Sequence, residues 1–273
     1  MRLARPQFQM TDGFAEIHLD VVAGVAVAAG AWVGAWLARG VRPRPGETVA
    51  FAGALVTLLA VLNGPLHALS DHYLFSAHMV QHLALTLAVP PLLLVGTPAF
   101  MVDGLLQRRT AARLARVLTR PVPALGLYSI ALVGWHLPGP YGVALEIHAW
   151  HIVQHLTLMI TATLAWWPVL ARSEIARPQP YAVQILYLFA FGLPMTAVAA
   201  MITGAETLLY PFYASAPRLL SLSALADQRL GGVIMWVPAG LVPLIAFTVV
   251  FFRWAAAERD ADDTAAVASR STS

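Results

Sequence analysis

Histidines occur in this sequence as two pairs with the spacing of one helical turn. His78 and His82 are four residues apart, and so are His151 and His155. On an α-helix, residues four apart lie one above the other on the same face, so each pair can offer two imidazoles to one metal ion. Imidazole is a ligand for copper, zinc, nickel and iron. The two pairs therefore predict a metal site, with these four histidines at its core.

Six further polar residues accompany these pairs. Four are histidines, which we interpret as outer or transfer ligands of the same site: His67, His72, His136 and His148. Two are glutamines that each stand one residue before the second histidine of a pair, Gln81 and Gln154. A side chain that hydrogen-bonds to a ligating imidazole fixes the orientation and tautomer of that ring. We expect both glutamines to have this orienting role.

The metal that fits this ligand set best is copper. The chain contains no cysteine, which excludes thiolate ligands. Neutral histidine, joined by the soft thioether of methionine, would bind copper reversibly and could pass it on. The candidate methionines, each of which is more often a packing residue than a ligand in a membrane core, are Met79, Met195, Met201 and Met235.

Haem is the leading alternative. Two histidines on different helices can ligate one iron from opposite sides, and His78 with His151, or His82 with His155, would form such a couple. The spacing does not decide between copper and haem. Proton translocation is less favoured, because the other half of the apolar segments has almost no ionisable residue to complete a path. Hydrolysis is less favoured because the sequence has no H-E-x-x-H motif.

Membrane helices must position these residues. Hydrophobic residues make up 59% of the 273 residues and charged residues only 11%, a balance that favours the bilayer as solvent. Apolar stretches long enough to cross a hydrocarbon layer of about 30 Å recur along the chain. We predict an all-α, polytopic transmembrane bundle of about seven spans, near residues 21–37, 49–66, 75–95, 122–137, 148–170, 181–203 and 230–252.

The arginines predict the orientation of this bundle. All 17 basic residues are arginine, and most of them follow the first, third, fifth and seventh spans. Since cytoplasmic loops collect positive charge, the N-terminus is predicted outside and the C-terminus inside a bacterial inner membrane. The histidines then lie near the extracytoplasmic face. Residues 109–120 have the pattern of a basic amphipathic helix that contacts membrane lipids, and the arginines do not form a nucleic-acid footprint.

An internal repeat organises the spans. The segment His78–Leu83 reappears as His151–Leu156, and Gln228–Leu230 takes the corresponding place in the last span. We therefore predict one leading helix followed by three helical hairpins of the same topology. The chain divides into an extracytoplasmic N-terminal segment (residues 1–20), a seven-helix transmembrane domain (residues 21–254) and a disordered cytoplasmic tail (residues 255–273).

Several motifs, in order, resemble those of one family. They are Ser76–His82, Gly134–Pro138, Glu146–His151 and, in the last span, Asp227–Gly232 with Met235–Pro238. Together they are similar to the bacterial CtaG-type cytochrome c oxidase assembly factors, the multi-span family associated with caa(3)-type oxidases. The likeness runs from the second span to the last.

This resemblance implies a non-catalytic role in maturing a haem-copper oxidase, by supplying or inserting copper on the outer side of the membrane. The implied partners are cytochrome c oxidase subunits, with other copper chaperones as further candidates. A haem-handling protein and a metal-free scaffold for assembly are the alternatives that the sequence leaves open.

Overall fold

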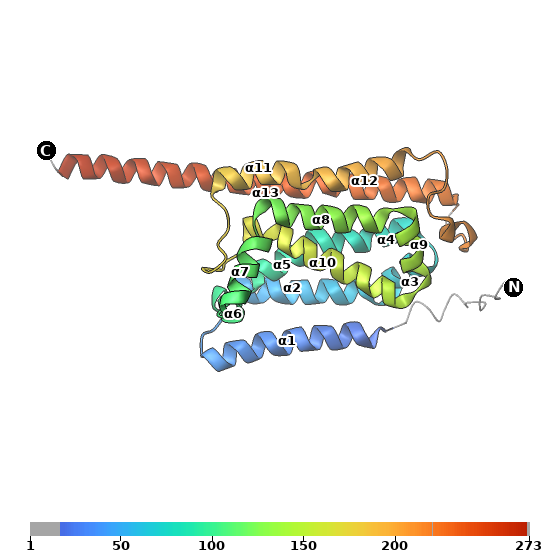
Figure 1. Cartoon of the computed structure of the whole chain (residues 1–273), viewed down its shortest axis with the longest axis horizontal. Coiled ribbons are helices and arrows are strands. Elements are labelled where there is room, and N and C mark those ends of the chain that lie inside the picture. The colour runs from blue at the N-terminus through green and yellow to red at the C-terminus, as the bar shows by residue number, and fades with distance from the viewer. Residues whose placement is uncertain (1–16, 220, 272–273) are drawn as a thin grey trace.

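Helices form all the regular structure in the part of the chain that the computed structural model describes, residues 17–219 and 221–271 (Figure 1). The long helices lie side by side, with α1 (Leu19–Arg39) along one edge of the bundle. The indole of Trp32 ties α1 to the rest, because its Nε1–H donates to the Gly96 carbonyl at 3.1 Å and its ring stacks on Phe51. The all-α prediction is confirmed.

Six helical stretches among the described residues are long and apolar enough to cross a membrane. They are α1, α2 (Pro45–Leu62), Phe75–Gly96, α10 (His148–Leu170), Tyr181–Gly204 and the first part of α13 (Ala224–Ser271). Phe75–Gly96 comprises α4 (Phe75–Leu83), the π-helical η2 (Ala84–Ala88) and α5 (Val89–Gly96), and Tyr181–Gly204 comprises α11 (Tyr181–Phe191) and α12 (Leu193–Gly204).

A seventh span is present if the helix pair α7 (Arg109–Leu118) and α8 (Pro121–His136) is counted as one, although the two are bent by 73°. The apolar α8 packs against α10 and α12 inside the bundle, whereas α7 carries the arginines of the predicted amphipathic helix. Each predicted hairpin pairs its own helices: α2 with α5, α8 with α10, and α12 with α13.

Four short helices connect the long ones. Two of them, α3 (Gly64–His72) and α9 (Pro138–Glu146), lie at the end of the bundle opposite to α6 (Ala99–Leu105) and α7 (Figure 1). The 3-10 helix η3 (Pro211–Ser215) contacts α9. These short elements cover the end of the bundle at which α2 and α8 stop and α4 and α10 begin.

The predicted N-terminal segment and the predicted C-terminal tail have different outcomes in the structure. Most of the N-terminal segment expected at residues 1–20 lies outside the described residues. The tail expected to be disordered from residue 255 instead continues α13 as a helix to Ser271. The composition of this segment explains why it is helical, since alanine is the best helix former and no glycine or proline follows Pro243 in this helix.

Three backbone carbonyls in the interior of the bundle have no helical donor and accept from a side chain instead. Those of Val61 and His136 lie in the last turns of α2 and α8, where the helical bonding ends. That of Thr86 stands four residues before Pro90, which has no N–H to donate to it. The donors are Gln81 Nε2 to Val61 O at 2.6 Å, Trp166 Nε1 to Thr86 O at 3.0 Å and the Tyr210 hydroxyl to His136 O at 2.7 Å.

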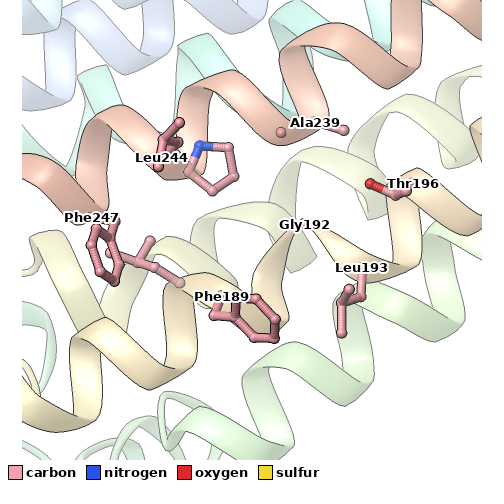
Figure 2. A pocket seen from close by; sticks show the side chains of 10 residues that line it. Phe189, Gly192, Leu193, Thr196, Ala239, Leu244 and Phe247 are labelled. Atoms are coloured by element: carbon pink, nitrogen blue, oxygen red, sulfur yellow. The ribbon is translucent and has the colours of Figure 1, made fainter.

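Close approach of α13 to its neighbours depends on glycine. A Cβ at Gly192 would lie 2.8 Å from the Ala239 carbonyl oxygen, and one at Gly232 would lie 2.8 Å from the backbone nitrogen of Thr203. Beside Gly192, an apolar groove of about 450 Å³ opens between α11, α12 and α13 (Figure 2). At Gly232, by contrast, the contact with the Thr203 backbone leaves no space for a larger residue.

We expect Gly232→Ala to lower the thermal stability of the detergent-solubilised protein by about 1–3 kcal/mol, the usual cost of overpacking. The control is Gly240→Ala in the same helix, where an added Cβ meets nothing within 4 Å. Equal melting temperatures for the two variants would contradict the packing described here.

Candidate metal centre

Three histidines form a compact group in the interior of the bundle. His78 and His82 come from α4 and His155 from α10, and each can offer one ring nitrogen such that these atoms all lie within 4.8 Å of one another. All three side chains are buried, and His78 is 0% exposed. The first helical pair and one member of the second thus meet across two packed helices, and we call these three residues the histidine triad.

His151 adjoins the histidine triad. Its Nε2 lies 3.1 Å from Nε2 of His155, and its ring centroid lies 5.1 Å from that of His78. The four histidines that the sequence analysis placed at the core therefore lie together. Their proximity follows from the packing of η2 and α5, which continue α4, against α10.

His136 and His67 lie on two other sides of the triad. His136, at the end of α8, has Nε2 3.3 Å from Nδ1 of His82, and its own Nδ1 lies 2.7 Å from the Leu132 carbonyl oxygen. His67 of α3 stacks on His151 with a centroid distance of 6.2 Å. Both are buried and each has hydrogen-bonding partners at its two ring nitrogens, so they differ from the triad members.

The remaining two predicted histidines lie away from the triad. The exposed His148, at the start of α10, has its ring 6.2 Å from that of His18. The ring of His72, at the end of α3, lies 6.3 Å from that of Tyr73. Neither belongs to the compact group of possible ligands in the described part of the chain.

The two glutamines behave differently, although the repeat makes them equivalent. Gln81 Nε2 lies 3.1 Å from Nδ1 of His67 while it donates to Val61 O, so it orients a histidine outside the triad. The side chain of Gln154 is buried, and neither its Oε1 nor its Nε2 has a hydrogen-bond partner among the described residues. Neither glutamine makes a hydrogen bond to a triad histidine in this structure.

Three residues that the sequence analysis did not assign also line the site. Asp71 of α3 lies 3.4 Å from Nε2 of His67 and 3.5 Å from Nδ1 of His151. The hydroxyls of Tyr141 in α9 and Tyr213 in η3 lie 3.1 Å and 3.2 Å from Nδ1 of His78. The four-residue spacing between His67 and Asp71 is a signal for the carboxylate. The tyrosines have no such signal, because they reach the site through long-range packing.

Asp71 is an anion despite its burial. Burial alone would raise the pKa of this carboxyl, but the hydrogen bond from His151 and the electrostatic attraction of the His151 and His67 rings lower that pKa well below its ordinary value. For His67, burial lowers the pKa more than the Asp71 carboxylate raises it. Both directions favour a carboxylate on Asp71 beside an uncharged imidazole at His67.

The methionines are packing residues rather than parts of the triad. Met79, Met195 and Met235 are buried within the hydrophobic core, and Met201 is 43% exposed. The donors gathered at the triad are imidazole nitrogens.

Two triad nitrogens are left without a partner. The Nε2 atoms of His78 and His82 are buried and make no hydrogen bond among the described residues. A buried polar atom without a partner costs roughly 1–3 kcal/mol, so two of them in one small volume need an explanation. A bound metal ion would supply it.

Asp227 supports the site from α13. Its carboxylate accepts hydrogen bonds from the backbone N–H groups of Phe75 and Ser76 and from the Ser76 hydroxyl, which satisfies the first turn of α4. Two residues later, Arg229 donates to the Ala205 carbonyl. Asp227 therefore fixes the start of the helix that carries His78 and His82.

Replacing Asp227 by Asn removes the charge from these hydrogen bonds and is expected to destabilise the protein by about 1.5–3 kcal/mol, the range for bonds to a charged group. Thermal unfolding in detergent measures the loss. Glu206→Gln makes the same chemical change at an exposed carboxylate and is expected to leave the melting temperature unchanged. Similar melting temperatures for wild type and Asp227→Asn would argue against this capping role.

Most of the chain matches a known protein family. The model of this family, described as cytochrome c oxidase caa3 assembly factor (Caa3_CtaG), matches residues 27–257. The chain belongs to this family. The matched region includes every triad residue as well as His67, Asp71, His136 and His151. The resemblance found in the sequence is thus confirmed, and the family match covers the part of the chain that holds these histidines.

Curated relatives of this caa3 assembly factor include uncharacterized mycobacterial proteins. Those of Mycobacterium bovis and Mycobacterium tuberculosis are each 25% identical over 203 residues, which is 68% of this chain and 31% of theirs. One of Mycobacterium leprae is 24% identical over 205 residues, 67% of this chain and 30% of its own. The chain spans about a third of the length of the curated relatives it matches. No solved structure matches it significantly.

Proposed function

We propose that this caa3 assembly factor binds copper as cargo at the extracytoplasmic end of its helical bundle and delivers it to a cytochrome c oxidase. The proposal deepens the role of the family, which is oxidase assembly. The single observation that carries it is the histidine triad, with its convergent and partly unpartnered nitrogens.

The donor set fits copper in its type and its number. Neutral imidazole is a good ligand for this metal, and three nitrogens within 4.8 Å of one another can bind one ion together. Cysteine is absent from the whole sequence, so no thiolate trap competes with the imidazoles. A site of imidazoles alone favours reversible binding, which a protein that hands over its cargo requires.

Crowding of the imidazoles favours copper over haem. His82 and His155, one of the couples that could ligate an iron from opposite sides, have ring centroids 5.4 Å apart. The ring of His78 lies 4.4 Å from the first and 5.7 Å from the second. A porphyrin between the couple would have to occupy the space that this third imidazole fills. A small ion needs no such space.

The side of the membrane follows from the distribution of charge. The triad lies toward the end of the bundle that carries α3 and α9, and the basic helix α7 lies at the opposite end (Figure 1). Because arginine-rich segments stay in the cytoplasm, the triad faces the extracytoplasmic side in this proposal. The N-terminus is then outside and the C-terminus inside.

We expect His78→Ala and His155→Ala to lose bound copper while the protein remains in the membrane. The measurement is the copper content of protein purified in detergent and equilibrated with copper, together with an absorption spectrum. His72→Ala is the matched control, a histidine of the same end of the bundle outside the triad, and it should retain wild-type copper. In cells, the two triad variants should also lose oxidase activity.

Several results would overturn this proposal. A Soret band with stoichiometric iron would establish haem handling in its place. Normal oxidase assembly after substitution of all triad histidines would leave a metal-free scaffold as the function. Wild-type copper content in His78→Ala would remove the triad as the site.

Copper should also stabilise the folded protein. A ligand that binds only the native state adds RT ln(1 + [L]/Kd) to stability, about 2.7 kcal/mol at a free concentration of 100 Kd. We expect this rise in melting temperature for wild type and for His72→Ala. His78→Ala and His155→Ala should show none, and an equal rise in all four proteins would place the stabilising ion elsewhere.

A further inference from the structure

We infer that Tyr213 and His136 are positioning residues, which fix the proton of His78 and of His82 on Nδ1 and so present both Nε2 lone pairs to the metal. The inference rests on the proposed function and assigns roles to two residues outside the triad. It is carried by hydrogen-bond chains that each end at a backbone carbonyl.

A carbonyl oxygen only accepts hydrogen bonds, so the group that is hydrogen-bonded to it must be the donor. A neutral imidazole has one N–H and one nitrogen lone pair, and the tautomer is set by the partner of either nitrogen. An unbranched chain of hydrogen bonds that starts at a carbonyl therefore determines every proton along it, and at a branch the arrangement that leaves no donor without an acceptor is preferred.

The first chain starts at Ser70 of α3. The Tyr213 hydroxyl donates to the Ser70 carbonyl at 2.9 Å, which commits its only proton. The Tyr213 oxygen can then only accept, from Nδ1 of His78 at 3.2 Å and from the Tyr141 hydroxyl at 3.4 Å. With the His78 hydrogen on Nδ1 each of these donors has an acceptor, whereas a hydrogen on Nε2 would have none. The lone pair of His78 is left on Nε2, which is buried and has no partner among the described residues.

The second chain starts at Leu132 of α8. The His136 ring has Nδ1 2.7 Å from the Leu132 carbonyl oxygen, so Nδ1 carries its hydrogen and Nε2 is an acceptor. That acceptor lies 3.3 Å from Nδ1 of His82, which must be the donor. The lone pair of His82 is again left on Nε2, and this atom is also buried without a partner.

A third set of contacts favours a ring hydrogen on Nδ1 in the same way, at His151. The Asp71 carboxylate lies 3.5 Å from Nδ1 of His151 and favours a hydrogen there, which leaves the lone pair of His151 on Nε2, beside His155. The amide of Gln81 donates to the Val61 carbonyl and faces Nδ1 of His67 with its other hydrogen. His67 therefore directs its own N–H from Nε2 to Asp71.

These assignments separate ligands from positioning residues. Both ring nitrogens of His136 and of His67 are engaged in the chains, so neither ring has a lone pair left for an ion. His78 and His82 each have one, on an Nε2 atom without a partner. The sequence separated core from outer histidines but gave all of them the role of ligands.

The two tyrosines beside His78 give a matched test. The hydroxyl of Tyr141 lies 3.1 Å from Nδ1 of His78 and 3.4 Å from the Tyr213 oxygen, and it donates to no carbonyl among the described residues, so it can donate to either. In Tyr213→Phe, Tyr141 is left to donate to Nδ1 of His78, which moves the ring hydrogen to Nε2. In Tyr141→Phe, the chain from Ser70 through Tyr213 is intact. Both tyrosines are buried, so a packing effect alone would not distinguish them.

The experiment is ¹⁵N NMR of histidine-labelled, metal-free full-length protein in lipid bilayers, since protonated and unprotonated ring nitrogens have well-separated shifts. Single histidine substitutions assign the signals. We expect the Nδ1–H tautomer for His78 and His82 in wild type, the same for His78 in Tyr141→Phe, and the Nε2–H tautomer for His78 in Tyr213→Phe. Copper affinity, measured separately, should fall about 10- to 100-fold in Tyr213→Phe and less in Tyr141→Phe.

An Nε2–H tautomer for His78 or His82 in the wild-type protein would overturn the inference, and this outcome needs no variant to fold. The same tautomer of His78 in Tyr213→Phe as in wild type would overturn the role of Tyr213. The expected tautomers in a protein that binds no copper would support the proton arrangement and overturn the proposed function alone.

Discussion

A carbonyl oxygen in the interior of a membrane protein must accept a hydrogen bond, and it can never donate one. This constraint connects the fold of the chain with its candidate metal centre. The carbonyls of Val61, Thr86 and His136 each lack a helical donor, two at helix ends and one before Pro90, and Gln81, Trp166 and Tyr210 supply the missing hydrogens from other parts of the chain. The same rule, that a carbonyl only accepts, assigns the hydrogens of the histidine cluster in the chains that start at Ser70 and Leu132.

Packing and polarity support each other in this arrangement. The first turn of α4 needs acceptors for its N–H groups, and Asp227 of α13 provides them because glycines allow α13 to approach closely. The hydrogen bonds in turn hold His78 and His82 in register with His155 of α10. At the other end of the bundle, Arg172 and Glu47 form an ion pair at 2.5 Å that joins the segment after α10 to α2. The start of α4 and the segment after α10 are thus each held by a charged partner.

Much of the fold could be predicted from the sequence, because hydrophobic runs and proline positions report directly on membrane helices. The same is true of the histidine pairs, since a four-residue spacing specifies a shared helical face. Periodicity does not report which loop folds over a site, so Tyr141 and Tyr213 could not be found. It also gave Gln81 and Gln154 equal roles. Gly134, at the place in the second hairpin that corresponds to Val61, already has its carbonyl bound by the N–H of Leu137, so Gln154 has no acceptor there.

The short helix α3 covers the histidine cluster and also supplies the Ser70 carbonyl and the Asp71 carboxylate, and it joins α2 through Gly64, which has a φ of +66°. Access and affinity are therefore coupled in one element. An ion bound at the triad would be enclosed while α3 is in place. Movement of α3 away from the bundle would uncover the triad and, in the same step, remove the Ser70 acceptor that fixes the hydrogen of His78, whereas the chain from Leu132 to His82 does not involve α3. The opening of α3 would thus weaken the site that it uncovers.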